Sequence, residues 1–214
     1  MPNDYRTAFR ARLTRARLLA ILRDAPDHAL PELSRCLVDT GIRFVEVALN
    51  TPGALGQISL LRSLLPEAVE VGAGTVLERA QAQAALAAGA TFLVSPCLSP
   101  EVQDLARELE IPTLPGAFTP GEVWQAHRSG AAMVKLFPAR SAGGPAYIKE
   151  LRGPFRDVPL LACGGISAQT ARDHLDAGAQ ALAFGGSVFA PARLAAGDFA
   201  VVRRDLEALA EAVR

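Results

Sequence analysis

The stretch Gly130-Ala-Ala-Met-Val-Lys-Leu-Phe-Pro138 decides the fold, because it shows how this chain passes from a helix into a buried strand. A glycine just past a helix relieves left-handed backbone strain, and the apolar run that follows is typical of a strand, which ends here at a proline. Three further segments repeat the pattern: Thr40-Gly-Ile-Arg-Phe-Val45, Ala88-Gly-Ala-Thr-Phe-Leu93 and Ala177-Gly-Ala-Gln-Ala-Leu182. The chain is therefore built from repeated helix-to-strand units.

Four more apolar runs bring the predicted strands to eight: Leu18–Arg23, Val69–Gly72, Ile111–Leu114 and Leu160–Cys163. Alanine- and leucine-rich segments with helical periodicity separate them, and continuous apolar strands covered by helices indicate a parallel sheet. Eight such units in 214 residues predict an α/β fold of the (β/α)8 TIM-barrel type. No linker-like segment interrupts the alternation, so we expect residues 1–214 to form a single domain. A doubly wound open sheet with fewer strands is the alternative.

A helix is expected outside the barrel at each end of the chain. The N-terminal segment is locally basic, with Arg6, Arg10, Arg12, Arg15 and Arg17. Such a composition also occurs in transit peptides, but the acidic Asp4 and the direct passage into a strand favour a helix that caps the barrel. The segment Gly197–Arg214 has the amphipathic pattern of a closing helix.

The composition argues against several classes of function. The 22 basic residues balance 22 acidic ones, and no basic patch carries interleaved aromatic residues, so nucleic acid is not an expected partner. No uncharged apolar stretch reaches the roughly 18–20 residues that cross a membrane. Cys36, Cys97 and Cys163 lie far apart without CxxC spacing, which favours reduced thiols, no zinc site and a cytoplasmic location.

Two ionisable residues lie on predicted buried strands, where a charge is costly. Lys135 is one of only two lysines in a chain that otherwise uses arginine for positive charge. Lost hydration on its apolar strand favours a neutral amine, which is a nucleophile for carbonyl carbons. Glu46, within Arg43-Phe-Val-Glu-Val-Ala-Leu-Asn50, is equally anomalous. A buried salt bridge is its structural interpretation, and a general acid/base beside the lysine is the one we favour.

A barrel concentrates function at the C-terminal ends of its strands. Those positions hold Arg23, Glu46, Asn50, Thr75, Ser95, Pro115, Lys135, Gly164, Gly165, Gly185, Gly186 and Ser187. The glycine turns in Cys163-Gly-Gly-Ile-Ser167 and Phe184-Gly-Gly-Ser187 follow the seventh and eighth strands, after which barrels commonly bind phosphate. Glycine lets backbone N–H groups approach phosphate oxygens closely. The sequence therefore predicts a phosphate site beside a reactive amine.

Eight short motifs follow one another along nearly the whole chain: Ile21-Leu-Arg23, Glu46-Val-Ala-Leu-Asn-Thr51, Val71-Gly-Ala-Gly-Thr-Val-Leu77, Ser95-Pro96, Leu114-Pro-Gly116, Val134-Lys-Leu-Phe-Pro138, Gly164-Gly-Ile-Ser167 and Gly185-Gly-Ser187. Their order resembles that of the 2-keto-3-deoxy-6-phosphogluconate/-galactonate aldolases, which are class I, pyruvate-dependent enzymes. The resemblance implies a lyase that cleaves a phosphorylated sugar acid and releases pyruvate.

The resemblance also implies residue roles. Lys135 would form the Schiff base and Glu46 would carry protons. Thr75 would hold the pyruvate carboxylate, together with Arg23, whose guanidinium can bind a carboxylate in a two-bond fork. The phosphate would lie against Gly164, Gly165, Gly186 and Ser187, and the substrate site would be completed by Asn50, Pro96, Phe137 and Gly185. No metal and no cofactor is required, and a homotrimer is implied.

The preferred sugar acid is left open between two branches of the family. Gluconate-type members carry an arginine where this chain has Asn50, and Gly144-Pro-Ala-Tyr-Ile-Lys149 resembles the galactonate branch. Against that, Gly185-Gly-Ser187 followed by Ala190-Pro191 resembles the gluconate branch. Asp24 stands where the family has a glycine after Arg23, so the entry loop departs from the family pattern. We favour 2-dehydro-3-deoxy-6-phosphogalactonate, cleaved to pyruvate and glyceraldehyde 3-phosphate. The gluconate epimer, with 4-hydroxy-2-oxoglutarate as a further substrate, is the alternative.

Two other classes of protein would use the same glycine turns. One is a different phosphate-binding barrel enzyme, such as an epimerase or a thiamine-phosphate-synthase-like transferase. The other is a sugar-phosphate binding protein without activity, in which Lys135 acts only as a cation. Both predict that Lys135 forms no covalent adduct.

Overall fold

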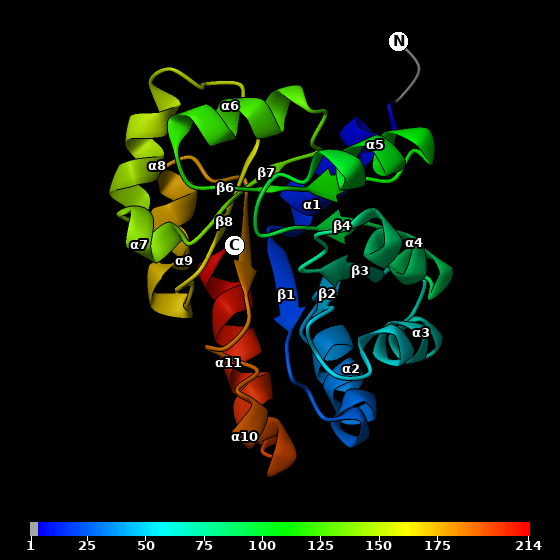
Figure 1. Cartoon of the computed structure of the whole chain (residues 1–214). Coiled ribbons are helices and arrows are strands. Elements are labelled where there is room, and N and C mark those ends of the chain that lie inside the picture. Colours follow the sequence, from blue (N-terminus) through cyan, green and yellow to red (C-terminus); the bar gives the residue numbers. More distant parts are fainter. Residues whose placement is uncertain (1–3) are drawn as a thin grey trace.

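The computed structural model describes residues 4–214 and contains nine parallel strands in one nearly closed barrel (Figure 1). The strands are β1 (Leu18–Leu22), β2 (Phe44–Ala48), β3 (Glu70–Gly74), β4 (Leu93–Val94), β5 (Thr113–Leu114), β6 (Gly116–Ala117), β7 (Val134–Leu136), β8 (Leu160–Cys163) and β9 (Ala181–Phe184). The hydrogen-bonded order is β5-β4-β3-β2-β1-β9-β8-β7-β6. The TIM-barrel prediction is confirmed, and the open-sheet alternative is wrong.

The ninth strand arises because a second short strand, β6, follows the predicted fifth strand directly after Pro115. β5 pairs with β4, whereas β6 pairs with β7, so residues 113–117 close the ring between its two ends. Proline has no N–H to donate to a ladder, which breaks the regular pairing at this position. Its carbonyl still accepts the N–H of Lys135 at 2.9 Å.

Helices surround the strands and follow them in sequence (Figure 1). They are α1 (Tyr5–Ala16), α2 (Leu30–Asp39), α3 (Ala54–Leu64), α4 (Arg79–Ala87), α5 (Pro100–Glu108), α6 (Pro120–Arg128), α7 (Ala139–Ala142), α8 (Pro145–Arg152), α9 (Ala168–Asp176), α10 (Pro191–Ala195) and α11 (Phe199–Ala212), with a short 3-10 helix at Asp27–Ala29. Within residues 4–214, no helix combines the length and the apolar character needed to cross a membrane.

The predicted N-terminal and closing helices are both present. The side chain of Asp4 accepts the backbone N–H of Arg6 and so caps the start of α1. Phe9 of α1 packs edge-on against Phe44, with ring centres 5.5 Å apart, and lies 5.3 Å from Phe92. Because these rings belong to the core inside the barrel, α1 closes the barrel at the N-terminal ends of its strands.

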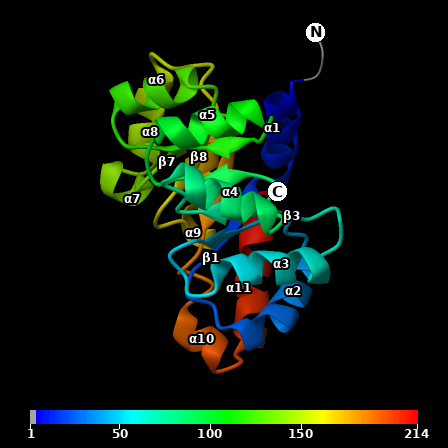
Figure 2. The ribbon, with the colours of Figure 1, turned by 45° about the vertical axis from the view of Figure 1, so that its right-hand side comes forward.

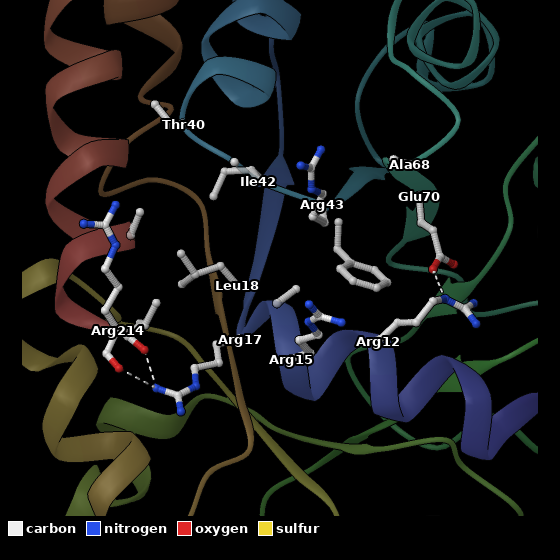
Figure 3. A pocket seen from close by; sticks show the side chains of 15 residues that line it. Arg12, Arg15, Arg17, Leu18, Thr40, Ile42, Arg43, Ala68, Glu70 and Arg214 are labelled. Atoms are coloured by element: carbon white, nitrogen blue, oxygen red, sulfur yellow. Dashed lines mark hydrogen bonds and ion pairs between the residues drawn. The ribbon is translucent and has the colours of Figure 1, made fainter.

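A cavity of about 580 Å³ adjoins α1 at this closed end, and arginines line it (Figure 3). Arg12 forms an ion pair with Glu70 at 2.7 Å, and Arg17 donates to the backbone carbonyl of Val213. Arg15 lies in the last turn of α1, where a cation offsets the negative end of the helix dipole. Arg12 therefore joins α1 to β3, and Arg17 joins the end of α1 to the C-terminal end of the chain.

The C-terminal ends of the strands open on the other side of the molecule. Helix α10, which follows β9, lies at the end of the molecule away from α1 in both views (Figures 1 and 2). The loops between strands and helices at this end carry the residues that the sequence singles out. The N-terminal ends of the strands are thus closed by α1, and the C-terminal ends remain available for a binding site.

Candidate functional site

Lys135 and Glu46 meet inside the barrel from strands that are not neighbours. Glu46 lies on β2 and Lys135 on β7, and Lys135 Nζ is 3.8 Å from Glu46 Oε1. The two residues are 2% and 6% exposed. Burial raises the pKa of the Glu46 carboxyl, and the positive charges of Lys135 and Arg23 offset part of this rise. The second carboxylate oxygen of Glu46, Oε2, is buried without a hydrogen-bond partner among residues 4–214.

The Glu46 carboxylate fits only because Gly74 has no side chain. A Cβ at Gly74 would lie 2.5 Å from Oε1 and 2.9 Å from Cδ of Glu46, which is too close for atoms that are not bonded to each other. Gly72 plays the corresponding part for the ring of Phe92, which a Cβ would meet at 2.5 Å. The two glycines of Gly72-Ala-Gly74 on β3 thus leave space inside the barrel for two side chains, Phe92 and Glu46. The role of Gly74 was not among the predicted site residues.

Arg23 and Thr75, two of the predicted site residues, come together at the mouth. The guanidinium Nη2 of Arg23 donates to Thr75 Oγ1 at 3.4 Å. Thr75 has φ 59°, in the left-handed region that β-branched residues rarely adopt, so the backbone that presents this hydroxyl is strained. Asp24, with φ 52°, donates its backbone N–H to Thr51 Oγ1 at 3.0 Å, which fixes the loop that carries Arg23.

The two glycine turns enclose a cavity of about 660 Å³. Seven predicted site residues line it: Arg23, Phe137, Gly164, Gly165, Gly185, Gly186 and Ser187. Ser187 Oγ donates to the carbonyl of Ile166 at 3.0 Å and so joins the turn after β9 to the turn after β8. Backbone amides, a hydroxyl and guanidinium groups are the donors that anions bind in proteins.

The inner wall of this cavity adjoins the lysine. Phe137 and Cys163 both line the cavity, and Lys135 Nζ lies 5.4 Å from the centre of the Phe137 ring. Burial raises the pKa of the Cys163 thiol to about 11, partly offset by the charge of Lys135. The thiol is therefore protonated at neutral pH and leaves the amine as the nucleophile beside the cavity. The chemistry available is carbonyl attack next to an anion site.

Five predicted residues do not line this cavity, namely Glu46, Lys135, Thr75, Asn50 and Pro96, and Arg140 was missed in addition to Gly74. Asn50 and Pro96 lie in the loops after β2 and β4 and do not line it. Arg140, at the start of the segment after β7, lines it although the sequence analysis did not single it out. Its contacts with Gly164 and Gly165, which are distant in sequence, mark it as part of the site.

Comparisons with known proteins agree with this chemistry. The family model described as KDPG and KHG aldolase matches residues 9–204. The KHG/KDPG aldolase of Escherichia coli (strain K12) is 39% identical over 174 residues, covering 81% of this chain and 80% of that protein. The probable 2-dehydro-3-deoxy-6-phosphogalactonate aldolase of Rhizobium meliloti (strain 1021) is 34% identical over 182 residues, 85% of each chain.

One similar solved structure contains a covalent intermediate formed with pyruvate. The KDPG aldolase of Legionella pneumophila, with pyruvate captured at low pH as a covalent carbinolamine intermediate, superposes with a TM-score of 0.86. It is 26% identical and covers 94% of this chain and 97% of its own. On the match of the family model and of these relatives, the chain belongs to the KDPG and KHG aldolase family and is a class I aldolase.

Proposed function

We propose that this aldolase cleaves a 2-keto-3-deoxy-6-phospho sugar acid, with the galactonate type favoured, to pyruvate and glyceraldehyde 3-phosphate through an imine on Lys135. The observation that carries the proposal is the 3.8 Å approach of Lys135 Nζ to the buried Glu46, beside a cavity lined by two glycine turns. A metal ion has no part in this scheme, because the protonated imine itself withdraws the electrons.

The chemistry follows from the two side chains. The neutral amine of Lys135 attacks the C2 carbonyl to give a carbinolamine, which loses water to form the protonated imine. The C3–C4 bond then breaks as the C4 hydroxyl loses its proton, and the bonding pair moves into the enamine of pyruvate. Protonation at C3 and addition of water release pyruvate and restore the amine.

Glu46 is the proposed proton carrier for these steps. Its Oε2 has no partner among the described residues, and burial raises the pKa of its carboxyl from the ordinary value, as suits a general acid/base. The carboxylate can accept the C4 hydroxyl proton and return a proton to the enamine. Because Gly74 leaves room for the carboxylate, the relay can start from its position 3.8 Å from Lys135 Nζ.

The two charged ends of the substrate have separate binding groups in this proposal. The carboxylate lies against Arg23 and Thr75, whose side chains meet at 3.4 Å. The phosphate lies against Gly164, Gly165, Gly186 and Ser187 at the outer cavity. Asn50 and Pro96 remain proposed contacts to the middle of the substrate, from loops at the same end of the barrel.

The galactonate type is favoured because Arg23 lies beside Thr75 and can bind the carboxylate, so that an arginine at the position of Asn50 is not needed. The gluconate epimer is the second candidate, since the Escherichia coli relative is named a KHG/KDPG aldolase and the Rhizobium meliloti relative a probable phosphogalactonate aldolase. Discrimination between epimers needs only a few kcal/mol from hydroxyl contacts.

The test is to measure kcat/KM on the two epimeric phosphorylated acids, with pyruvate detected by a coupled dehydrogenase. We expect both to be cleaved, the galactonate epimer faster. A higher kcat/KM for the gluconate epimer would assign the enzyme to the other substrate. Release of pyruvate from neither would reject the proposed substrate class.

We also propose a cytoplasmic homotrimer. In support, several large apolar side chains are exposed, among them Trp124 at 46% and Phe118 at 42%. Trp124 stacks on Phe155 with ring centres 6.0 Å apart, which fixes the orientation of its exposed face. An exposed aromatic face of this kind can pack against another subunit. Sedimentation equilibrium should give three times the 22.5 kDa chain mass, whereas a monomer mass would reject the trimer.

A further inference from the structure

We propose that Arg140 binds the terminal phosphate of the substrate and sets the preference of this enzyme for phosphorylated over unphosphorylated sugar acids. The inference rests on the proposed function and adds a residue to it. Arg140 lies on α7, in the segment that directly follows the strand of Lys135. It lines the 660 Å³ cavity together with the two glycine turns.

The backbone and side chain of Arg140 are both held against the turn after β8. Its N–H donates to the carbonyl of Gly164 at 3.1 Å. A Cβ at Gly165 would lie 2.5 Å from Arg140 Nε and 2.8 Å from its Cβ, so the arginine runs directly across this glycine. Gly165 therefore makes room for the guanidinium, in addition to exposing its own backbone amide. An arginine that merely covered the surface would not require this close approach.

The guanidinium of Arg140 differs from the structural arginines of the chain in having no acceptor among residues 4–214. Arg152, by contrast, donates to the carbonyls of Gly178 and Val158, and Arg193 donates to Val188 and to Asp205. Both of these hold loops together. Within residues 4–214, exposed arginines such as Arg156 share this lack of a protein acceptor, but Arg140 is the one of them that lines the cavity, so its donors are available to a ligand there.

The charged side chains that line the cavity favour binding of a phosphate dianion beside Arg140. Arg23 is the other cation that lines it, and Asp24 is its only acidic side chain among the described residues. Arg23 is committed to Thr75 near the inner end. A planar guanidinium matches phosphate oxygens in a two-bond fork, and charge-assisted hydrogen bonds of this kind are about twice as strong as neutral ones. Arg140 supplies the fork that the backbone amides of the glycine turns lack.

The test compares Arg140→Ala with Arg140→Lys and with Arg156→Ala. Arg156 is an exposed arginine before β8, at the opposite ends of the strands, so its variant loses the same charge away from the cavity. Each protein is assayed on the phosphorylated sugar acid and on the same acid without its phosphate. For Arg140→Ala, we expect the ratio of the two kcat/KM values to fall about 10–100-fold, the usual effect of losing hydrogen bonds to a charged group.

Arg140→Lys should recover part of the ratio, because it keeps the charge and loses the fork. Arg156→Ala should keep the wild-type ratio. Inorganic phosphate should inhibit wild type competitively, and its inhibition constant should rise in Arg140→Ala by a factor similar to the fall in the ratio. An Arg140→Ala ratio within about twofold of wild type, or an equal fall in Arg156→Ala, would overturn the inference.

Failure of the proposed function has a different signature. All variants are also incubated with pyruvate and borohydride, and the intact mass is measured. An adduct in every variant combined with an unchanged ratio rejects only the role of Arg140. Absence of the adduct from wild type rejects the Schiff-base function itself, whatever the ratio.

Discussion

Replacing Gly74 with alanine tests whether the position of the Glu46 carboxylate matters for turnover. The added Cβ would lie 2.5 Å from Glu46 Oε1, 2.9 Å from Cδ and 3.3 Å from Cγ, whereas ordinary contacts begin at 3.4 Å. The carboxylate must therefore move by about 0.9 Å in a site where it is only 2% exposed. A misplacement of about 1 Å in a catalytic group can lower the rate about 10²-fold. Overpacking should also cost about 1–3 kcal/mol of stability.

The assay for Gly74→Ala measures kcat on the phosphorylated acid and unfolding in urea. Gly56→Ala is the matched control, because a Cβ on this glycine of α3 would meet nothing within 4 Å. We expect the control to keep the wild-type rate and to gain about 0.5–1 kcal/mol of stability from helix propensity. Gly74→Ala should fold and lose about 10²-fold in kcat. A folded Gly74→Ala protein with wild-type kcat would refute the argument that Gly74 positions Glu46.

Three further predictions concern Glu46 and the cysteines. Glu46→Gln should lower kcat by about 10²–10⁴-fold while the circular dichroism spectrum is unchanged, and full activity would exclude a proton-carrying role. Because burial raises the Glu46 pKa above its unfolded value of about 4.3, the native state binds the proton more tightly. Wild type should therefore lose stability relative to Glu46→Gln as pH rises from about 4.3 through the raised pKa, and urea titrations that show a constant difference would contradict this. With the pKa of Cys163 at about 11 and Cys36 buried, a thiol reagent at neutral pH should modify only the exposed Cys97 in the folded protein, which peptide mass mapping can check.

Much of the fold could be predicted from the sequence because it is encoded locally. Each glycine after a helix and each apolar run that follows it is a short-range signal, and the strands lie within a few residues of their predicted positions. The additional strand β6 after Pro115 was not predicted, since Gly116–Ala117 is too short a run to stand out.

The candidate site was predictable where a residue type is anomalous in its context. Lys135 and Glu46 stand out because a charge on an apolar strand is costly, and the structure brings them to 3.8 Å. Gly74 and Arg140 carry no such signal. Their importance depends on a neighbour that is distant in sequence, Glu46 for the first and Gly165 for the second. Such contacts exist only once the barrel has closed.

The central claim is that the amine of Lys135 forms an imine with pyruvate. The direct measurement is to incubate the protein with pyruvate and borohydride, to measure the intact mass by mass spectrometry, and to map the modified peptide. We expect one reduced pyruvate adduct per chain, on Lys135, and none in Lys135→Ala. No adduct on wild type, or an adduct that persists in Lys135→Ala, would contradict it.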